Sequence, residues 1–387
     1  MSKRIALTGG GTGGHITPLL AVAEELKKQD PSCYVIYIGE RNGRFKHLTD
    51  ASAHIDESHE VFAGKLRRYH GESWLKRLLD IKTNILNIRD VSYIVLGTIQ
   101  AVVVVKKLKP DMILLKGGFV GVPVGLAAAF WRTPFVTHDS DTVPGLANRL
   151  VSKWARFHAT GMPAEYYQYP KQSIRYVGVL VSNNYQFVTE ELQNTYRKQL
   201  SLPSQAKLLL ITGGSTGAAN INQAVSAIVD DLVSLNQDLH VIHQVGVGKG
   251  GLYDGFSHER VQVVELFNPM FEYTGAADVV VTRAGANTMA ELGIQGKACI
   301  VVPNPLLTGG HQTKNAQVWK QHSAAEIIEE EVLKSDSKIL LETINALLAD
   351  KEKRRLLGNN LEQLTAKNAS KKLATILLNP ENNEIPS

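Results

Sequence analysis

Two glycine-rich segments contain the residue types that bind phosphate groups. The first is Gly9-Gly10-Gly11-Thr12-Gly13-Gly14-His15, which includes the pattern G-x-G-x-x-G. Because glycines have no side chains, the backbone can approach an anion closely, and the N–H groups that begin the following helix can point at it. We therefore expect an anion site at this turn. A tight turn without a ligand is the alternative, although one turn rarely needs five glycines.

The second segment is Gly213-Gly214-Ser215-Thr216-Gly217-Ala218. Its Ser215 could donate its hydroxyl group to a phosphate oxygen, or it could cap the N-terminus of a helix. Glu40 ends an expected strand, where a dinucleotide-binding fold places the acid that binds a ribose. Binding of NAD is therefore an alternative that the first segment and Glu40 leave open.

Polar residues follow apolar runs at later points, where ligands of parallel sheets bind. Residues 283–291 combine small residues with Glu291, which is either an acceptor for ribose hydroxyls or a solvated acid on a helix. Residues 311–316 follow a loop with two prolines and two glycines. Their polar side chains suit sugar hydroxyls, which require paired donors and acceptors, and a plain surface loop is the alternative.

The segment His138-Asp139-Ser140-Asp141 follows another apolar run. A histidine beside carboxylates can act as a general base. A structural cluster of hydrogen bonds is the alternative for the same residues. Neither this segment nor any other has a spacing typical of metal ligands.

Residues 65–89 combine positive charge with an apolar stripe. The segment contains seven Lys or Arg and two acids, so its excess charge equals the formal net charge of the whole chain, +5. Such a segment can lie on an anionic membrane surface, or bind nucleic acid or an acidic partner. A helix whose stripe is simply buried is the alternative. The stripe consists of Trp74, Leu78, Ile81 or Ile85, and Ile88.

Length and composition limit the class of protein. A chain of 387 residues is long enough for two domains. Cys33 and Cys299 lie far apart, which indicates neither a disulfide framework nor a zinc site and favours a reducing compartment. The N-terminus has too few apolar residues for a signal peptide. The longest apolar stretch, residues 93–105, is shorter than the ~20 residues of a spanning helix, so we expect no integral membrane protein.

Strand and helix patterns alternate, which predicts α/β architecture with parallel sheets. The order of strand, glycine turn and helix restarts at residue 207, so we expect two Rossmann-like domains with a junction near residues 163–178. The predicted bounds are 1–165, 175–365, and a C-terminal helix and tail over 366–387. The expected strands are residues 4–8, 34–38, 112–115, 134–137, 207–212, 239–244, 261–264, 279–282 and 298–302.

Taken together, these segments resemble glycosyltransferase family 28, in particular its bacterial members that transfer N-acetylglucosamine from UDP to a lipid-linked peptidoglycan precursor. Six ordered blocks carry the resemblance, and they span most of the chain. The blocks are residues 9–18, 116–123, 138–149, 213–222, 283–291 and 311–316.

The resemblance implies a GT-B fold, with an acceptor domain, a donor domain and an active site between them. It implies inverting transfer from UDP-N-acetylglucosamine to undecaprenyl-pyrophosphoryl-N-acetylmuramyl-pentapeptide, with no cofactor and no metal. It also implies a peripheral protein at the cytoplasmic face of the membrane. There residues 65–89 would contact the anionic lipid surface, and no nucleic acid would be a partner.

The resemblance also implies roles for single residues. His15 is the candidate base beside the acceptor pyrophosphate, with His138 and Asp139 as alternatives. Phe267 would lie near the uracil, and Glu291 would accept the ribose hydroxyls. Ser215 and the helix start at 286–289 would face the diphosphate, Gln312 the sugar, and residues 12–14 the donor. The remaining implied contact residues are Thr12, Gly13, Gly14, Asp141, Asn148, Ala286, Asn287, Thr288, Met289 and Asn315.

Two departures from the family pattern affect the donor. The family has Asn where this chain has Asp141, and it has an Arg that meets the donor phosphates, which the run 178–182 lacks. Such a charge-assisted phosphate contact is worth ~1.5–3 kcal/mol. A different UDP-sugar or lipid acceptor therefore stays open. An NAD-dependent oxidoreductase and a non-catalytic nucleotide-sugar-binding module also stay open, although the presence of both His15 and Glu291 argues against the second.

Overall fold

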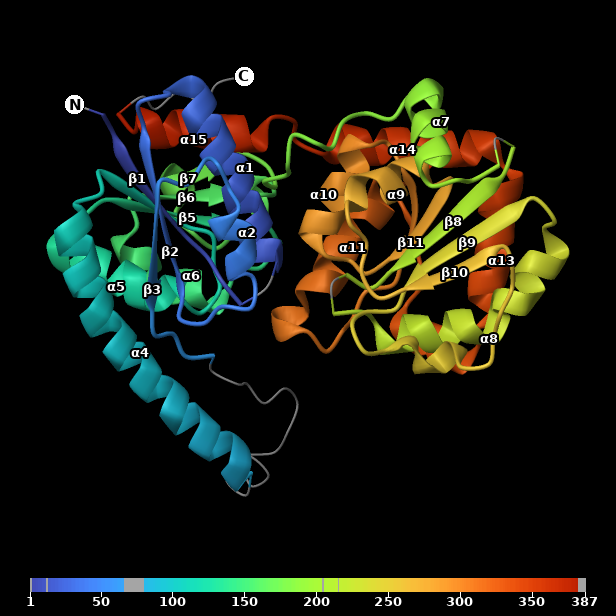
Figure 1. Ribbon diagram of the computed structural model, residues 1–387, viewed down its shortest axis with the longest axis horizontal. Helices are drawn as coiled ribbons and strands as arrows, with labels where there is room; N and C mark the ends of the chain where they lie inside the picture. Colours follow the sequence, from blue (N-terminus) through green and yellow to red (C-terminus); the bar gives the residue numbers. More distant parts are fainter. Residues whose placement is uncertain (1, 12, 66–79, 204, 215, 382–387) are drawn as a thin grey trace. The chain divides into compact units, whose positions relative to one another are not determined.

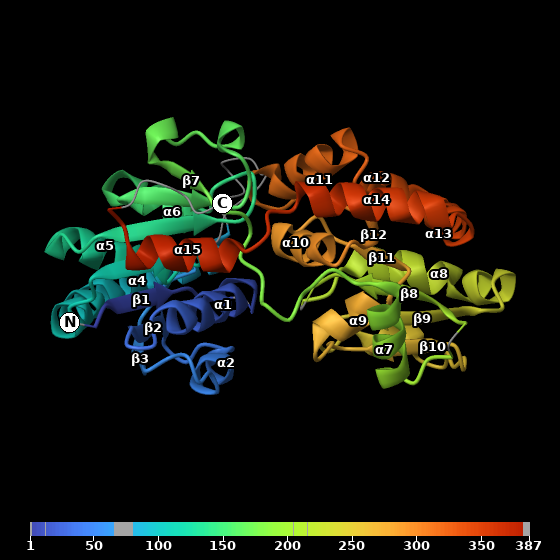
Figure 2. The same ribbon diagram turned by 90° about the horizontal axis from the view of Figure 1, so that it is seen from above.

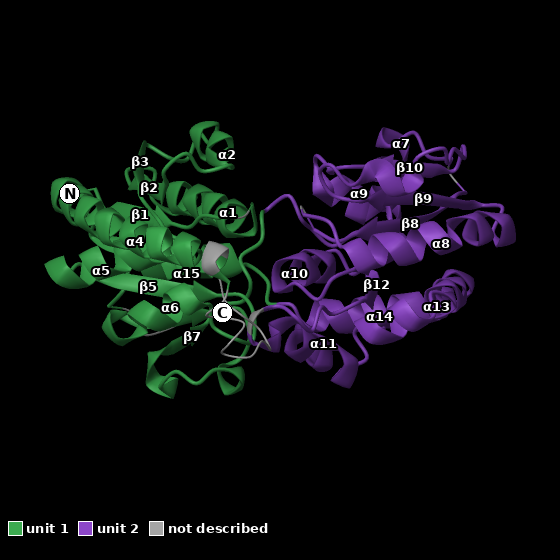
Figure 3. Cartoon of the chain, turned by 90° about the horizontal axis from the view of Figure 1, so that it is seen from below, with its two compact units in different colours: residues 1–182, 366–387 green, residues 183–365 purple. Residues whose placement is uncertain are grey.

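The structure is a computed structural model that describes residues 2–11, 13–65, 80–203, 205–214 and 216–381. The chain divides into two compact units: unit 1 contains residues 1–182 and 366–387, and unit 2 contains residues 183–365 (Figure 3). Each unit has one parallel sheet with helices packed on it. The prediction of α/β class and two Rossmann-like domains is therefore confirmed.

The described residues of unit 1 form a seven-stranded sheet in the order β3-β2-β1-β4-β5-β6-β7. All of its strand pairs are parallel. In this order the chain changes direction between β1 and β4, and ligands of such sheets bind at the carboxyl ends of those strands. The strands are β1 (Arg4–Thr8), β2 (Tyr34–Glu40), β3 (Glu57–Val61), β4 (Met112–Leu115), β5 (Phe135–Asp139), β6 (Phe157–Thr160) and β7 (Ile174–Tyr176).

Helices cover both faces of this sheet (Figure 2). Because side chains alternate along a strand, Ile5 and Leu7 of β1 pack toward α1 and α15, whereas Ala6 packs toward α4 and α5. The helices of unit 1 are α1 (Gly13–Gln29), α2 (Lys46–Asp50), α4 (Ile81–Leu108), α5 (Gly121–Trp131), α6 (Leu146–Val151) and α15 (Ala369–Leu378), with short 3-10 turns at η1 (Ser152–Trp154), η2 (Ala164–Tyr166) and η3 (Lys171–Ser173).

Helix α4 is longer than the apolar stretch in the sequence suggested. The Asp80 side chain caps its N-terminus by accepting a hydrogen bond from the Thr83 N–H group. In the described part of the chain it is the one helix that is long and apolar enough, by length and composition, to cross a membrane. Ala101 and Val105 are nevertheless fully buried against unit 1, and the N-terminal part of α4 reaches beyond the sheet (Figure 1).

The described residues of unit 2 form a six-stranded parallel sheet in the order β10-β9-β8-β11-β12-β13. This order repeats that of unit 1, with the change of direction between β8 and β11. The strands are β8 (Lys207–Thr212), β9 (Leu239–Gln244), β10 (Val261–Val264), β11 (Val279–Thr282), β12 (Ala298–Val301) and β13 (Glu326–Ile327).

The largest core of unit 2 lies where α8 and α13 pack on the sheet, and it includes Ile221, Val225 and Ile344. Outside this core, α9 contacts both β8 and α7, and α14 contacts α10. The helices are α7 (Glu190–Gln199), α8 (Ala219–Leu235), α9 (Met270–Ala276), α10 (Ala286–Ile294), α11 (His311–Gln321), α12 (Glu330–Ser335), α13 (Lys338–Ala349) and α14 (Lys351–Leu364), with 3-10 turns at η4 (Gly250–Tyr253) and η5 (Thr308–Gly310).

The boundary between the units differs from the expected junction near residues 163–178. Strand β7 pairs with β6 and completes the first sheet, so unit 1 continues to residue 182. Helix α15 also returns to unit 1 and packs on α1. There Thr375 Oγ1 donates a hydrogen bond to Gln29 Oε1 at 2.8 Å. The C-terminal helix is therefore an integral layer of unit 1 and not a separate tail.

Candidate functional site

The first glycine turn lies at the change of direction in the unit 1 sheet. It follows β1, and the loop that follows β4 lies beside it, since the Lys116 N–H group donates to Thr8 O at 2.8 Å. A Cβ atom at Gly9 would lie 2.9 Å from His15 O, and one at Gly11 would lie 2.7 Å from the Phe119 ring. Gly9 and Gly11 therefore permit close packing of protein segments, and the anion site at this turn stays a prediction.

Two side chains of β2 hold this turn, and sequence reasoning did not predict either contact. The Tyr37 hydroxyl group donates to Gly9 O at 2.8 Å, and Glu40 Oε1 accepts from the Gly11 N–H group at 3.2 Å. Burial raises the pKa of the Glu40 carboxyl group, while its hydrogen bond from Gly11 opposes that shift. The acid that a dinucleotide-binding fold would use for a ribose instead supports the turn.

His15 is the third residue of α1, where the first N–H groups of the helix have no partner within the helix. Burial, and then the charge of Lys116, lower the pKa of its imidazole to about 4, although Asp141 opposes this shift. The ring makes a hydrogen bond to the Lys116 backbone. Among the described residues its buried Nδ1 atom has no hydrogen-bond partner. A neutral ring with an unused nitrogen is what a general base requires.

His138, Asp139 and Asn148 form a buried network behind the turn. His138, at 1% exposure, donates from Nε2 to Gly178 O at 3.0 Å. Asp139 accepts hydrogen bonds from the Gly145 N–H group at 3.0 Å, from Asn148 Nδ2 at 2.9 Å and from a tyrosine hydroxyl group. Burial lowers the pKa of His138 and raises that of Asp139. These contacts favour the structural interpretation for Asp139. His138 also has an Nδ1 atom without a partner among the described residues, so it stays the weaker alternative to His15 as a base.

The run 178–182, where the resemblance implies a phosphate-binding Arg that this chain lacks, crosses the interior of unit 1. Gly178 has φ +100°, and a Cβ atom there would lie 2.4 Å from the Ala366 Cβ atom. Val179, Leu180 and Val181 are buried. In this chain the run therefore packs against the C-terminal segment of unit 1.

Other predicted contact residues of unit 1 lie around the same turn. Gly13 and Gly14 begin α1, and a Cβ atom at Gly13 would make only ordinary contact with the Phe45 ring. Asp141 follows β5 and is partly exposed. Thr12 lies outside the described residues, as does Ser215 of unit 2, so their predicted roles stay predictions.

The second glycine turn lies at the change of direction in the unit 2 sheet, after β8. Gly217 has φ +67°, and a Cβ atom there would lie 1.9 Å from Val245 O. Asn222 Nδ2 holds the same carbonyl oxygen at 2.8 Å. A larger residue at position 217 would therefore displace the turn.

Beside this turn, α10 begins directly after β11, with its N-terminus at the carboxyl edge of the sheet. Asn315 Nδ2 donates to Ala284 O at 3.1 Å and so fixes the segment that leads into the helix. Ala286 and Met289 are buried, whereas Asn287 and Thr288 are partly exposed. The helix start can thus present N–H groups to an anion.

Glu291 lies in α10 and is partly buried. Burial raises the pKa of its carboxyl group to about 7, and a hydrogen bond from the Tyr185 hydroxyl group opposes that shift. The sequence did not predict Tyr185, because it lies 106 positions away and no local pattern marks it. This hydrogen bond orients the carboxyl group, which is the first requirement for a ribose-binding acid.

Gln312 and Phe267 are also in unit 2. Gln312 is buried and its Oε1 atom accepts from the Asn304 N–H group at 2.9 Å. Phe267 stacks on Tyr273 with ring centroids 4.5 Å apart. Unit 2 thus brings the glycine turn and α10 together at one sheet edge, whereas His15 and Asp141 belong to unit 1.

Metal binding has no support within the described ranges. No group of three or more His, Cys, Asp or Glu among those residues is placed to hold a metal ion. The expected independence from metals stays a prediction.

Comparisons with known proteins identify the family of this chain. The N-terminal domain of glycosyltransferase family 28 matches residues 5–160, and its C-terminal domain matches residues 208–375. A UDP-N-acetylglucosamine–N-acetylmuramyl-(pentapeptide) pyrophosphoryl-undecaprenol N-acetylglucosamine transferase of Acetivibrio thermocellus is 30% identical over 97% of both chains. A protein of the same name from Legionella pneumophila is 33% identical, again over 97% of both chains.

A crystal structure of MurG from Acinetobacter baumannii has the same fold. It matches with a TM-score of 0.68 and 22% identity, over 97% of this chain and 99% of that one. The two sheets of this chain are therefore those of a GT-B glycosyltransferase. Because the curated relatives match almost end to end at 30% identity or more, this chain belongs to glycosyltransferase family 28.

Proposed function

We propose that this chain transfers N-acetylglucosamine from UDP-N-acetylglucosamine to undecaprenyl-pyrophosphoryl-N-acetylmuramyl-pentapeptide. The names of its relatives state this reaction for those proteins. The observation that carries the proposal for this chain is the neutral His15 imidazole at the start of α1, with Nδ1 lacking a partner among the described residues. A general base thus lies beside a helix N-terminus that can bind an anion. This combination suits an acceptor whose hydroxyl group must lose a proton near a diphosphate.

The chemical step follows from these groups. His15 takes the proton of the acceptor hydroxyl group while the oxygen attacks C1 of the sugar. The C1–O bond to the UDP β-phosphate breaks as the new bond forms, so the configuration at C1 inverts. Negative charge then develops on the leaving UDP. Preorganised N–H groups at the start of α10 are suited to stabilise that charge. The step transfers no electrons, so it needs no redox cofactor.

The donor would lie on unit 2. Glu291, oriented by Tyr185, is suited to accept the ribose hydroxyl groups, and the stacked Phe267–Tyr273 pair offers an aromatic surface for the uracil. We keep Gln312 as the contact to the sugar, although its Oε1 atom is already held by the Asn304 N–H group. Its side-chain amide NH2 group would supply the contact.

We further propose that unit 1 docks peripherally on an anionic membrane, at the cytoplasmic face. Most of the basic segment 65–89 lies outside the described residues, but α4 continues it with a solvent-exposed apolar stripe. The opposite face of α4 is buried on unit 1, so lipid cannot surround this helix and a position on the bilayer surface fits better than a span. The exposed stripe consists of Ile85, Ile88, Val91, Val95, Ile99 and Val103.

An NAD-dependent oxidoreductase has no remaining support. Its argument rested on the first glycine pattern and on Glu40, and Glu40 accepts a hydrogen bond from the turn itself.

Kinetics of His15→Ala test the proposed function. We expect turnover to fall by about 10²- to 10⁴-fold, the usual contribution of a general base, while the affinity for UDP stays unchanged. The exposed His47→Ala is the matched control, and normal turnover of His15→Ala would remove His15 as the base.

A further inference from the structure

Lys116 is a buried ammonium group at the change of direction in the unit 1 sheet. It directly follows β4, and its side chain is 3% exposed. Its Nζ atom donates to Ser140 Oγ at 2.7 Å. Among the described residues this neutral hydroxyl group is the acceptor found for Nζ. A buried cation usually requires more compensation than one hydroxyl group supplies.

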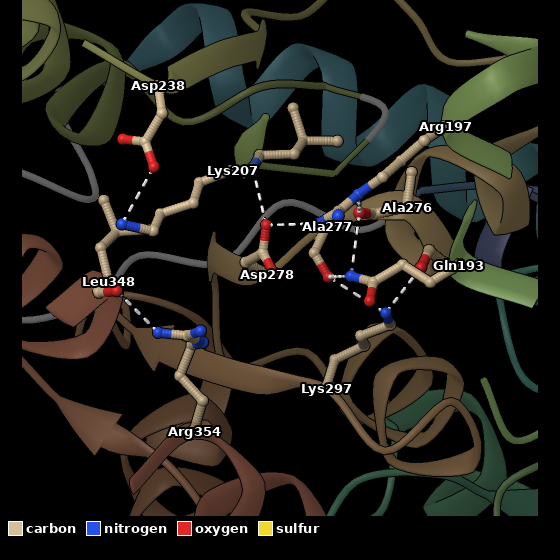
Figure 4. A network of polar contacts seen from close by, with 12 residues as sticks. Gln193, Arg197, Lys207, Asp238, Ala276, Ala277, Asp278, Lys297, Leu348 and Arg354 are labelled. Carbon is tan, nitrogen blue, oxygen red and sulfur yellow. Dashed lines mark hydrogen bonds and ion pairs between the residues drawn. The ribbon is translucent and has the colours of Figure 1, made fainter. Parts of the chain in front are cut away.

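Unit 2 contains a comparison within the same chain. Lys297 is buried to a similar degree, at 6% exposure, but its Nζ atom donates to two carbonyl oxygens, Gly275 O at 2.6 Å and Ala277 O at 3.0 Å. It also lies beside the ion pair of Arg197 and Asp278 (Figure 4). These contacts are at the amino end of β11, away from the glycine turn. The buried charge of Lys297 is therefore compensated by two carbonyl acceptors at Nζ, whereas the acceptor found for Lys116 is one hydroxyl group.

The charges around Lys116 come from three segments that meet at the turn. Burial lowers the pKa of Lys116 to about 8, and the charges of Asp141 and Asp139 oppose this shift. The Asp139 carboxylate already accepts hydrogen bonds from the Gly145 N–H group and from Asn148 Nδ2. Lys116 in turn lowers the pKa of His15, whereas Asp141 raises it. Lys116, Asp141 and His15 therefore form one electrostatic unit.

The position of this unit indicates what it would bind. The His15 ring lies over Gly117, because a Cβ atom there would be 3.6 Å from His15 Nδ1. A buried nitrogen with no partner among the described residues, a buried ammonium group and the N-terminus of a 17-residue helix thus adjoin one turn. The ammonium group and the helix N-terminus favour an anion, and a diphosphate carries enough negative charge to use both.

We propose that Lys116 and Asp141 act as one charge-compensated pair that sets the affinity of this turn for the acceptor's diphosphate. Lys116 supplies the fixed positive charge beneath the turn, and Asp141 balances that charge while no anion is bound. The acceptor's identity rests on the proposed function, but binding of a diphosphate by this pair does not. The pair also gives Asp141 a role, because its carboxylate compensates the charge of a buried lysine.

Binding of inorganic pyrophosphate tests the pair without any assay of transfer. Calorimetric titration of the full chain, with saturating UDP to occupy unit 2, gives the pyrophosphate Kd. We expect Lys116→Met to weaken binding by about 10- to 100-fold, as loss of a charge-assisted contact does, and Asp141→Asn to strengthen it. The double variant should bind more tightly than Lys116→Met, because its lost positive and negative charges cancel.

Three further variants separate this role from a structural one. Lys371→Met, at an exposed lysine of α15, should leave the pyrophosphate Kd unchanged, and Lys297→Met should lower Tm with the same Kd. Lys116→Arg keeps the charge and should retain most of the affinity. If Lys116→Met fails to fold, Lys116→Gln and the double variant replace it. Equal Kd values for the wild type and the Lys116 variants would overturn the proposal.

Two kinetic measurements test the same pair: the KM for each substrate and the pH dependence of kcat/KM. In Lys116→Met the KM for the lipid-linked acceptor should rise by about 10- to 100-fold, while the KM for UDP-N-acetylglucosamine stays within about twofold. The acidic limb of kcat/KM should move up from about pH 4, because Lys116 lowers the pKa of His15. If pyrophosphate binding depends on Lys116 but no sugar is transferred, the pair stands and the proposed function fails.

Discussion

Gly118 packs directly on the backbone of Gly10. A Cβ atom at position 118 would lie 2.4 Å from Gly10 O, and Gly118 has φ +75°, where side chains other than glycine are strained. The loop after β4 and the turn after β1 are therefore in close contact, with His15 next to both. The position of the proposed base depends on this contact between two glycines.

Gly118→Ala should accordingly disturb the turn. We expect a loss of about 1–3 kcal/mol in the free energy of unfolding, the usual cost of strain at such a position, and a fall in kcat that exceeds any change in UDP affinity. Gly121→Ala is the matched control, since its Cβ atom would only touch the Ala147 Cβ atom at 4.0 Å. Thermal unfolding and steady-state kinetics measure both effects, and equal behaviour of the two variants would show that the contact does not position the turn.

The pH dependence of the wild type should reveal the lowered pKa of His15. A base with a pKa of about 4 stays unprotonated in the free enzyme down to about pH 5, so kcat/KM should fall only below that pH. A bound diphosphate adds negative charge near the ring and raises its pKa. We therefore expect the acidic limb of kcat at a higher pH than that of kcat/KM. Limbs at the same pH, near 6.5, would show that His15 is not the buried group described above.

Glu291→Gln should raise the stability of the protein at pH 8 and weaken its binding of UDP. The folded-state pKa of about 7 lies above the usual 4.5, so the folded state binds more protons between these values and its stability falls as pH rises from 4.5 to 7. We expect the variant to be more stable than the wild type at pH 8, by on the order of 1–3 kcal/mol, and no more stable at pH 4. Its UDP affinity should fall, because an amide accepts fewer hydrogen bonds than a carboxylate.

The exposed Glu342→Gln in α13 is the control for this variant. It should change neither the dependence of Tm on pH nor the affinity for UDP. A Glu291→Gln protein with wild-type stability at both pH values would mean that the carboxyl group is not held in a desolvated position.

The exposed face of α4 should determine membrane binding. Ile88 is 71% exposed and Ile99 is also exposed, so the double change to Asp should leave Tm nearly unchanged. It removes two apolar side chains that would each contribute about 1.5–3 kcal/mol on insertion. Partition onto vesicles with anionic lipid should therefore fall at least about tenfold. Leu235→Asp, at an exposed position of α8, is the control, and unchanged partition of the α4 variant would contradict peripheral docking through this helix.

The sequence predicted best those elements whose pattern is local. Long apolar runs located β1, β8 and β11, whereas β3, β6, β7 and β13 were missed. Glu57–Val61 is mostly polar, and Ile174–Tyr176 has only three residues in a stretch interpreted as a junction. The return of α15 onto α1 could not be predicted, because an apolar helix face does not identify its partner.

In the candidate site, too, contacts between residues far apart in the sequence could not be predicted. The glycine turns and Glu291 could be selected as candidates because small residues and acids stand out after strands. The contacts that position them come from distant side chains: Tyr37 holds Gly9, and Tyr185 holds Glu291. Lys116 was part of a recognised block, but its burial and its one hydroxyl partner among the described residues distinguish it from other lysines.

The central claim is tested most directly by assaying transfer from several UDP-sugars to lipid-linked N-acetylmuramyl-pentapeptide. The account predicts that UDP-N-acetylglucosamine is the preferred donor, that UDP is released in equal amount, and that the new bond has inverted configuration at C1. Preferred transfer from another UDP-sugar, or no transfer from UDP-N-acetylglucosamine while UDP still binds unit 2, would contradict it.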